Sequence, residues 1–97
     1  MDRTLVIARL QAAEPELRRL GVRQLYLVGS TARDDAQDTS DVDLFFDYDR
    51  GGFGLFQLMD VRERASEILG RRADIMTRDS LHQALRPAIA ASAIRVF

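Results

Sequence analysis

The sequence predicts one α/β domain, of the α+β kind, in which helices cover mainly one face of a small mixed β-sheet. Its 97 residues suffice for a single hydrophobic core, so residues 1–97 are expected to form one domain. Two observations predict the fold. Apolar residues recur at helical spacing in two segments, and short apolar runs lie between and after these segments. Helices and strands that alternate in this way bury their apolar faces against each other.

The two longest predicted helices occupy residues 3–20 and 55–69. The first has leucines at helical spacing and stops before Gly21. Pro15 lies inside it, and because proline lacks a backbone N–H, this helix is expected to be split or kinked. The second places its charged residues largely opposite its apolar face and is expected to end at Gly70.

Three strands are predicted, at residues 24–29, 41–49 and 71–77. Residues 30–35 are expected to form a helical turn or short helix. Residues 34–40 are expected to form a loop, and the glycine-rich residues 51–54 a flexible turn. Beyond the third strand we expect a short helix through Leu85, a last helix over residues 87–94 (PAIAASAI), and a final short strand or partner contact in IRVF.

Composition excludes several classes of protein. There is no cysteine, which rules out disulfides and thiolate metal sites. All fourteen basic residues are arginine, and without lysine neither a P-loop nor Schiff-base chemistry is available. The net charge of −1 gives no general attraction to nucleic acid, so no direct nucleic-acid binding is expected. No signal-like or membrane-spanning apolar run is present, which predicts a cytoplasmic protein without membrane contact.

Two aspartates stand at the start of the second predicted strand, in the sequence DVDLFF. Residues two apart in a strand point to the same face, so Asp41 and Asp43 project together. Adjacent carboxylates repel unless a cation lies between them, and such oxygen ligands suit Mg²⁺. The alternative is a solvated strand end, which is the better explanation of an isolated pair of aspartates because surface carboxylates are common.

A second candidate element follows the first predicted strand. Gly29 permits close backbone approach, and Ser30 adds a hydroxyl donor where a helix N-terminus offers N–H groups to an anion. Arg33 lies three residues later, on the same helical face, where it can reach a phosphate or a carboxylate. The alternative is that Ser30 simply caps a short helix.

The third candidate is Asp74, in the middle of the last predicted strand. A carboxylate among apolar strand residues is costly unless it meets a partner. It either joins Asp41 and Asp43 around metal ions, where it could also take a proton from an attacking hydroxyl, or it forms an ion pair with a nearby arginine (Arg71, Arg72 or Arg78).

Together these residues resemble a known family. Gly29-Ser30-x-x-Arg33, followed by Ser40-Asp41-x-Asp43-Leu44 and a later strand aspartate, is similar to the signature of DNA polymerase beta-like nucleotidyltransferases, and most closely to the minimal nucleotidyltransferases (MNT). The resemblance implies the nucleotidyltransferase fold, a triphosphate held by Gly29 and Ser30, and two Mg²⁺ ions bound by Asp41, Asp43 and Asp74. One departure is Asp34, where the family has glycine; an extra carboxylate there would alter the loop or hinder a triphosphate.

The resemblance also implies a biological role. Similar minimal proteins act as antitoxins that transfer AMP from ATP to a tyrosine of a HEPN-type ribonuclease toxin, so a heterocomplex or oligomer is expected. An alternative is a non-catalytic antitoxin that masks its toxin, because the apolar segment 88–97 is a candidate contact surface. Transfer to a small molecule such as an aminoglycoside ranks lower, since so short a chain leaves little room for an acceptor pocket. A calcium loop in DDAQDTSDVD fails because the required glycine and closing glutamate are missing.

Overall fold

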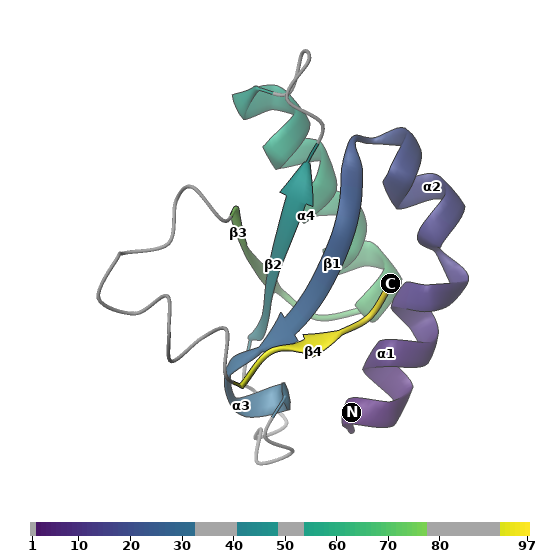
Figure 1. Ribbon diagram of the computed structural model, residues 1–97, viewed down its shortest axis with the longest axis vertical. Coiled ribbons are helices and arrows are strands. Elements are labelled where there is room, and N and C mark those ends of the chain that lie inside the picture. Colours follow the sequence, from purple (N-terminus) through teal and green to yellow (C-terminus); the bar gives the residue numbers. More distant parts are fainter. Residues whose placement is uncertain (1, 33–40, 49–53, 78–91) are drawn as a thin grey trace.

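The computed structural model describes residues 2–32, 41–48, 54–77 and 92–97. They form four strands and four helices, in the order α1 (Arg3–Ala12), α2 (Glu14–Arg19), β1 (Val22–Val28), α3 (Gly29–Ala32), β2 (Val42–Tyr48), α4 (Leu55–Leu69), β3 (Ala73–Thr77) and β4 (Ile94–Arg95). Figure 1 shows the sheet with α4 behind it and with α1 and α2 along one side. No helix in these ranges has the length and apolar character that crossing a membrane requires.

The sheet is mixed, as predicted, with the strand order β3-β2-β1-β4. β2 runs antiparallel to β1 and parallel to β3, and β4 runs antiparallel to β1. A parallel pair needs a crossover connection, and α4 supplies it between β2 and β3. The sheet therefore brings together the start of β2, the start of β3 and the end of β1 at one edge.

The helices cover one face of this sheet. The main core contains fully buried side chains from three helices and the strands, among them Leu10 of α1, Leu17 of α2, Leu69 of α4 and Phe46 of β2. The opposite face carries a smaller cluster of Val28 and Phe45, with Tyr26, Met76 and Ala93 packed against it. The expectation of helices mainly on one face is confirmed for the described residues.

Local signals explain the helix boundaries. Asp2 caps α1 by accepting a hydrogen bond of 2.8 Å from the Leu5 N–H. The first predicted helix is indeed split, because α1 ends at Ala12 and Pro15 lies in the first turn of α2, where its missing N–H costs nothing. α4 has the predicted bounds, and its cap Gly70 adopts a left-handed φ of 65°.

Some boundaries differ from the prediction. β1 starts two residues early, at Val22, and ends at Val28, so Gly29 begins the short helix α3 instead of closing the strand. β3 starts at Ala73, two residues late. The predicted loop at 34–40, most of the break at 51–54, the short helix expected through Leu85 and most of the helix expected over 87–94 lie outside the described residues. The last residue of that helix, Ile94, belongs to β4.

The chain ends inside the fold. β4 pairs with β1, which confirms the expected final strand, and the next two residues, Val96 and Phe97, are buried in the main core. The Arg18 guanidinium lies 5.0 Å from the centre of the Phe97 ring. For these two residues, the expectation that the apolar C-terminal segment is left for a partner is wrong, because β1 and the α1–α2 layer bury them.

Candidate functional site

The three candidate segments meet at one edge of the sheet. Val28, the last residue of β1, pairs with Asp43 of β2, and Asp43 pairs with Asp74 of β3. Because paired residues on neighbouring strands point to the same face, Asp43 and Asp74 lie side by side, with Cα atoms about 4.8 Å apart. Both belong to the face opposite the main core, where the described helices do not pack.

Gly29 is required by the position of Asp43. A Cβ atom added to Gly29 would lie 2.4 Å from Oδ2 of Asp43, so the Asp43 carboxylate would have to move away. Gly29 also has a φ of 74°, which disfavours other residues. The backbone therefore passes directly against a carboxylate, and the sequence motif has a steric explanation.

Asp41 lies just before β2 and its side chain is 47% exposed. Its Oδ2 atom is 3.9 Å from Nε of Arg72, a solvated ion pair that is too long for a hydrogen bond. The neighbouring backbone is fixed more firmly, because the Val42 N–H donates to the Arg72 carbonyl at 3.0 Å. The structure thus places Asp41 and Asp43 at the start of β2, as predicted.

Asp74 is exposed, although the sequence suggested a carboxylate set among apolar neighbours. The explanation is its face: Ala73 and Thr77 point into the core, while Asp74 points away from it. Arg72, one of its three candidate partners, forms its ion pair with Asp41. In the part of the chain that the structure describes, no three carboxylate or imidazole side chains are gathered closely enough to hold a metal ion.

The phosphate-binding candidates are placed only in part. Gly29 and Ser30 open α3, a helix of four residues at the same edge of the sheet. The side chain of Ser30 and all of Arg33 and Asp34 lie outside the described residues. Their proposed roles in holding a triphosphate stay predictions.

Ser66 supports this edge and was missed from the sequence. Its Oγ atom donates to the Arg62 carbonyl at 2.8 Å and accepts from the Ala73 N–H at 3.0 Å, which ties α4 to the first residue of β3. Asp74 is the next residue, so Ser66 helps to fix its backbone. A serine on a helix gives no sequence signal of such a contact, because the contact depends on where the next strand starts.

Known nucleotidyltransferases resemble this chain over most of its length. The nucleotidyltransferase domain model matches residues 10–96. Protein adenylyltransferase MntA of Thermococcus cleftensis is 32% identical over 82% of this chain and 81% of its own length. A candidate protein adenylyltransferase of Methanocaldococcus jannaschii, MJ0435, is 32% identical over 84% of this chain and 87% of its own length.

Solved structures agree on the fold. A structure described as a minimal nucleotidyltransferase superposes with a TM-score of 0.85 at 30% identity and covers 97% of this chain and 95% of its own. A toxin–antitoxin complex with AMP-PNP gives a TM-score of 0.72 at 14% identity, over 90% of this chain and 72% of its own. At that lower identity the likeness concerns the fold alone. The chain therefore belongs to the nucleotidyltransferase domain family and is an enzyme of the minimal nucleotidyltransferase type.

Proposed function

We propose that this protein is an antitoxin that transfers AMP from ATP to a hydroxyl group of a HEPN-type toxin, most simply a tyrosine hydroxyl. The relative from Thermococcus cleftensis is named a protein adenylyltransferase. One solved structure of similar fold is described as a tri-AMPylated Shewanella oneidensis HEPN toxin in complex with MNT antitoxin, with a TM-score of 0.66 at 13% identity. The observation that carries the proposal is the pairing of Asp43 with Asp74, beside a glycine that makes room for the Asp43 carboxylate.

The residues at this edge have the donor chemistry of a divalent-metal site, although their three carboxylates are not gathered around one point in the structure. Asp43 and Asp74 share a face and a register position, Asp41 stands two residues before Asp43, and carboxylate oxygens are the ligands that Mg²⁺ prefers. Asp41, Asp43 and Asp74 would hold two Mg²⁺ ions. When bound, these ions would activate the acceptor hydroxyl and neutralise charge on the departing pyrophosphate.

The chain itself has three tasks in this reaction. Gly29 lets the backbone at the start of α3 pass directly against the Asp43 carboxylate, so a triphosphate held by the α3 backbone would lie next to the acidic groups. Asp74 accepts the proton that the acceptor hydroxyl loses. The hydroxyl oxygen then bonds to the α-phosphorus of ATP as the bond to pyrophosphate breaks, and the rigid pairing of β2 with β3 keeps the acidic groups aligned.

The test is the isosteric substitution Asp41→Asn, with Asp60→Asn on the exposed surface of α4 as the matched control. Each variant is incubated with ATP labelled at the α-phosphate, Mg²⁺ and the toxin candidate encoded beside it. We expect Asp41→Asn to abolish labelling and Asp60→Asn to retain it, with unchanged unfolding curves for both. Full labelling by Asp41→Asn would show that the metal assignment is wrong.

A non-catalytic antitoxin is the second candidate, and exposed apolar side chains favour it. Leu55, Phe56 and Met59 at the start of α4 are 68%, 79% and 55% exposed, which suits a contact surface. The variant with Asp41→Asn and Asp43→Asn together separates the two functions. Growth rescue by this variant in cells that express the toxin would support masking, and loss of rescue would support modification.

A further inference from the structure

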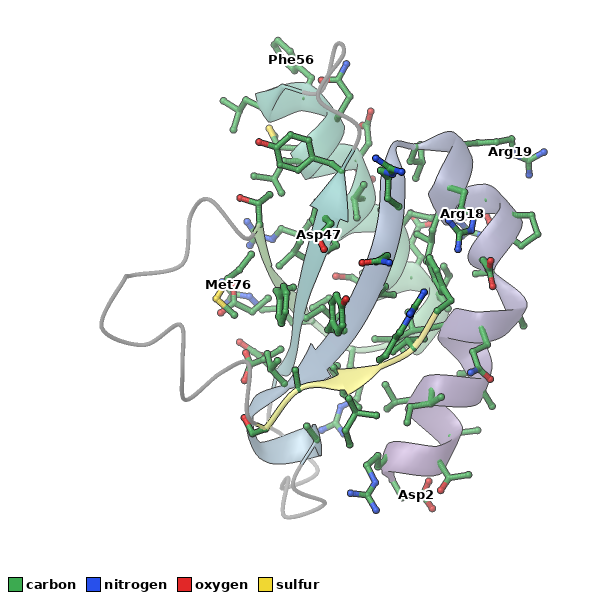
Figure 2. The ribbon with its side chains drawn as sticks, in the orientation of Figure 1. Asp2, Arg18, Arg19, Asp47, Phe56 and Met76 are labelled. Atoms are coloured by element: carbon green, nitrogen blue, oxygen red, sulfur yellow. The ribbon has the colours of Figure 1, made fainter. Side chains whose placement is uncertain are left out.

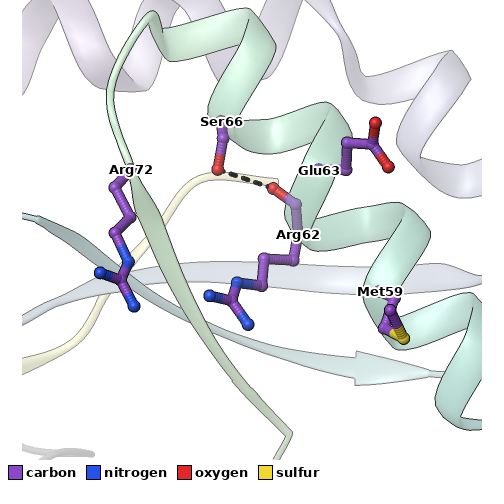
Figure 3. A pocket seen from close by; sticks show the side chains of 5 residues that line it. All are labelled: Met59, Arg62, Glu63, Ser66 and Arg72. Atoms are coloured by element: carbon purple, nitrogen blue, oxygen red, sulfur yellow. Dashed lines mark hydrogen bonds between the residues drawn. The ribbon is translucent and has the colours of Figure 1, made fainter.

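A groove lies between the outer side of α4 and the start of β3. It has a volume of about 470 Å³ and is lined by Met59, Arg62, Glu63, Ser66 and Arg72. Figure 3 shows the Arg62 and Arg72 side chains extending in the same direction, with Glu63 pointing away from both. Its size falls within the range of ligand-binding clefts.

The two arginines of this groove, Arg62 and Arg72, lack, within the described ranges, the close ion pairs that Arg64 forms. Arg64 bonds to Glu16 and, at 2.9 Å, to Glu67, and these carboxylates raise its pKa. In the described parts of the chain Arg62 has no ion pair, and the Arg72 side chain is 71% exposed and reaches Asp41 only at 3.9 Å. The groove therefore presents the Arg62 charge, which has no ion pair among the described residues, and the Arg72 charge, whose long, solvated pair with Asp41 leaves it accessible to a carboxylate from another molecule.

The groove continues into an apolar surface. Met59 lines the groove. Phe56 lies three residues earlier on the same side of the helix, in the first turn of α4 (Figure 2). Burying exposed side chains of this size is the usual source of affinity at protein interfaces. An occupant would thus present an apolar side chain to Met59 and Phe56 and carboxylates to Arg62 and Arg72.

The groove lies on the β3 side of the candidate site. Across the edge of the sheet, Gly29 stands beside Asp43, Asp43 beside Asp74, and the groove begins at Arg72, beyond both. If the nucleotide is held near Gly29, a second substrate that approaches from the β3 side passes this groove before it reaches Asp74. Arg72 joins the groove to the site, because it contacts Asp41 as well.

From these observations we infer that the α4–β3 groove docks an acidic, amphipathic segment of the protein acceptor, with its carboxylates on Arg62 and Arg72. The inference rests on the proposed transfer to a protein. It adds the surface that selects the acceptor and the charge that the acceptor carries. Each exposed ion pair adds only modestly to the free energy of binding. The two arginines together should therefore change the affinity for an acidic segment about three- to thirtyfold.

Binding of two synthetic peptides tests the inference without any transfer step. One fluorescein-labelled peptide contains leucine, tyrosine and glutamate, and the other has glutamine at every glutamate position. Fluorescence anisotropy measures binding to the intact protein. We expect the acidic peptide to bind at least threefold more tightly, and Arg62→Glu with Arg72→Glu to remove this preference.

Arg19→Glu is the matched control, because Arg19 projects from α2 away from this groove (Figure 2). It should keep the preference for the acidic peptide, and Phe56→Ser should weaken binding of both peptides. Equal binding of the two peptides, or equal effects of Arg19→Glu and of the double Arg62→Glu, Arg72→Glu variant, would overturn the inference. Absence of AMP transfer together with selective peptide binding would instead overturn the proposed function and leave the docking surface standing.

Discussion

Replacing Gly29 with alanine should separate steric blocking of the site from ordinary backbone strain. The added Cβ would lie 2.4 Å from Oδ2 of Asp43, and an ordinary contact begins at 3.4 Å, so the carboxylate must move by about 1 Å. A misplacement of this size in an active site can lower the rate about 100-fold. The left-handed φ of 74° costs about 1–2 kcal/mol for a residue with a Cβ, and the overpacked contact adds about 1–3 kcal/mol.

Gly70→Ala is the matched control for this experiment. Gly70 has a similar φ of 65°, but its added Cβ would meet nothing within 4 Å. It should therefore lose only the strain energy of about 1–2 kcal/mol and keep full transfer activity. Urea unfolding measures the free energy of each variant, and labelling from ATP measures transfer.

Repeating the Gly29→Ala substitution in an Asp43→Ala variant tests whether the Asp43 carboxylate causes the loss. In Asp43→Ala the Oδ2 and Cγ atoms are gone and only the Cβ contact of 3.2 Å remains, so Gly29→Ala should cost about as much there as Gly70→Ala does. Equal losses of stability for Gly29→Ala and Gly70→Ala in the natural background, with equal transfer activity, would refute the steric argument.

Four further substitutions probe the support of the site and the fold. Ser66→Ala should lower the free energy of unfolding by about 1–3 kcal/mol in urea, because the backbone N–H at the start of β3 loses its acceptor. Glu16→Gln should flatten the dependence of stability on acid pH. Hydrogen bonding to Arg64 lowers the pKa of Glu16, so the pair stabilises the fold above the ordinary glutamate pKa, and this is lost as pH falls through the folded value. Phe97→Ala should cost about 3–5 kcal/mol, whereas Phe56→Ala should change stability by less than about 0.5 kcal/mol.

Each of these expectations has a contrary result. An unchanged urea midpoint for Ser66→Ala would show that β3 does not depend on its hydroxyl. Parallel stability curves for Glu16→Gln and the natural protein, measured by thermal unfolding across acid pH, would show that the Arg64 pair does not contribute. Similar losses for the two phenylalanine variants would contradict the burial of the C-terminus in the core.

Prediction succeeded where the signal is local. The apolar spacing of residues 55–69 and the glycine after them gave α4 its observed bounds, because helix periodicity and a left-handed cap act within a few residues. Pro15 similarly predicted the break between α1 and α2, since its effect is confined to one turn. Strand ends were less accurate, because they depend on which neighbour a strand pairs with.

The sequence alone determined the order of helices and strands in the described residues, the mixed sheet and the family signature with its aspartates. Only the tertiary structure decided that Asp43 faces Asp74 and that Gly29 lies against the Asp43 carboxylate. It also decided that Phe97 is buried and that Arg62 shares a groove with Arg72. The reason is physical. Helix periodicity and helix caps depend on residues that are close in the sequence, whereas strand register and side-chain packing depend on residues that are far apart in the chain.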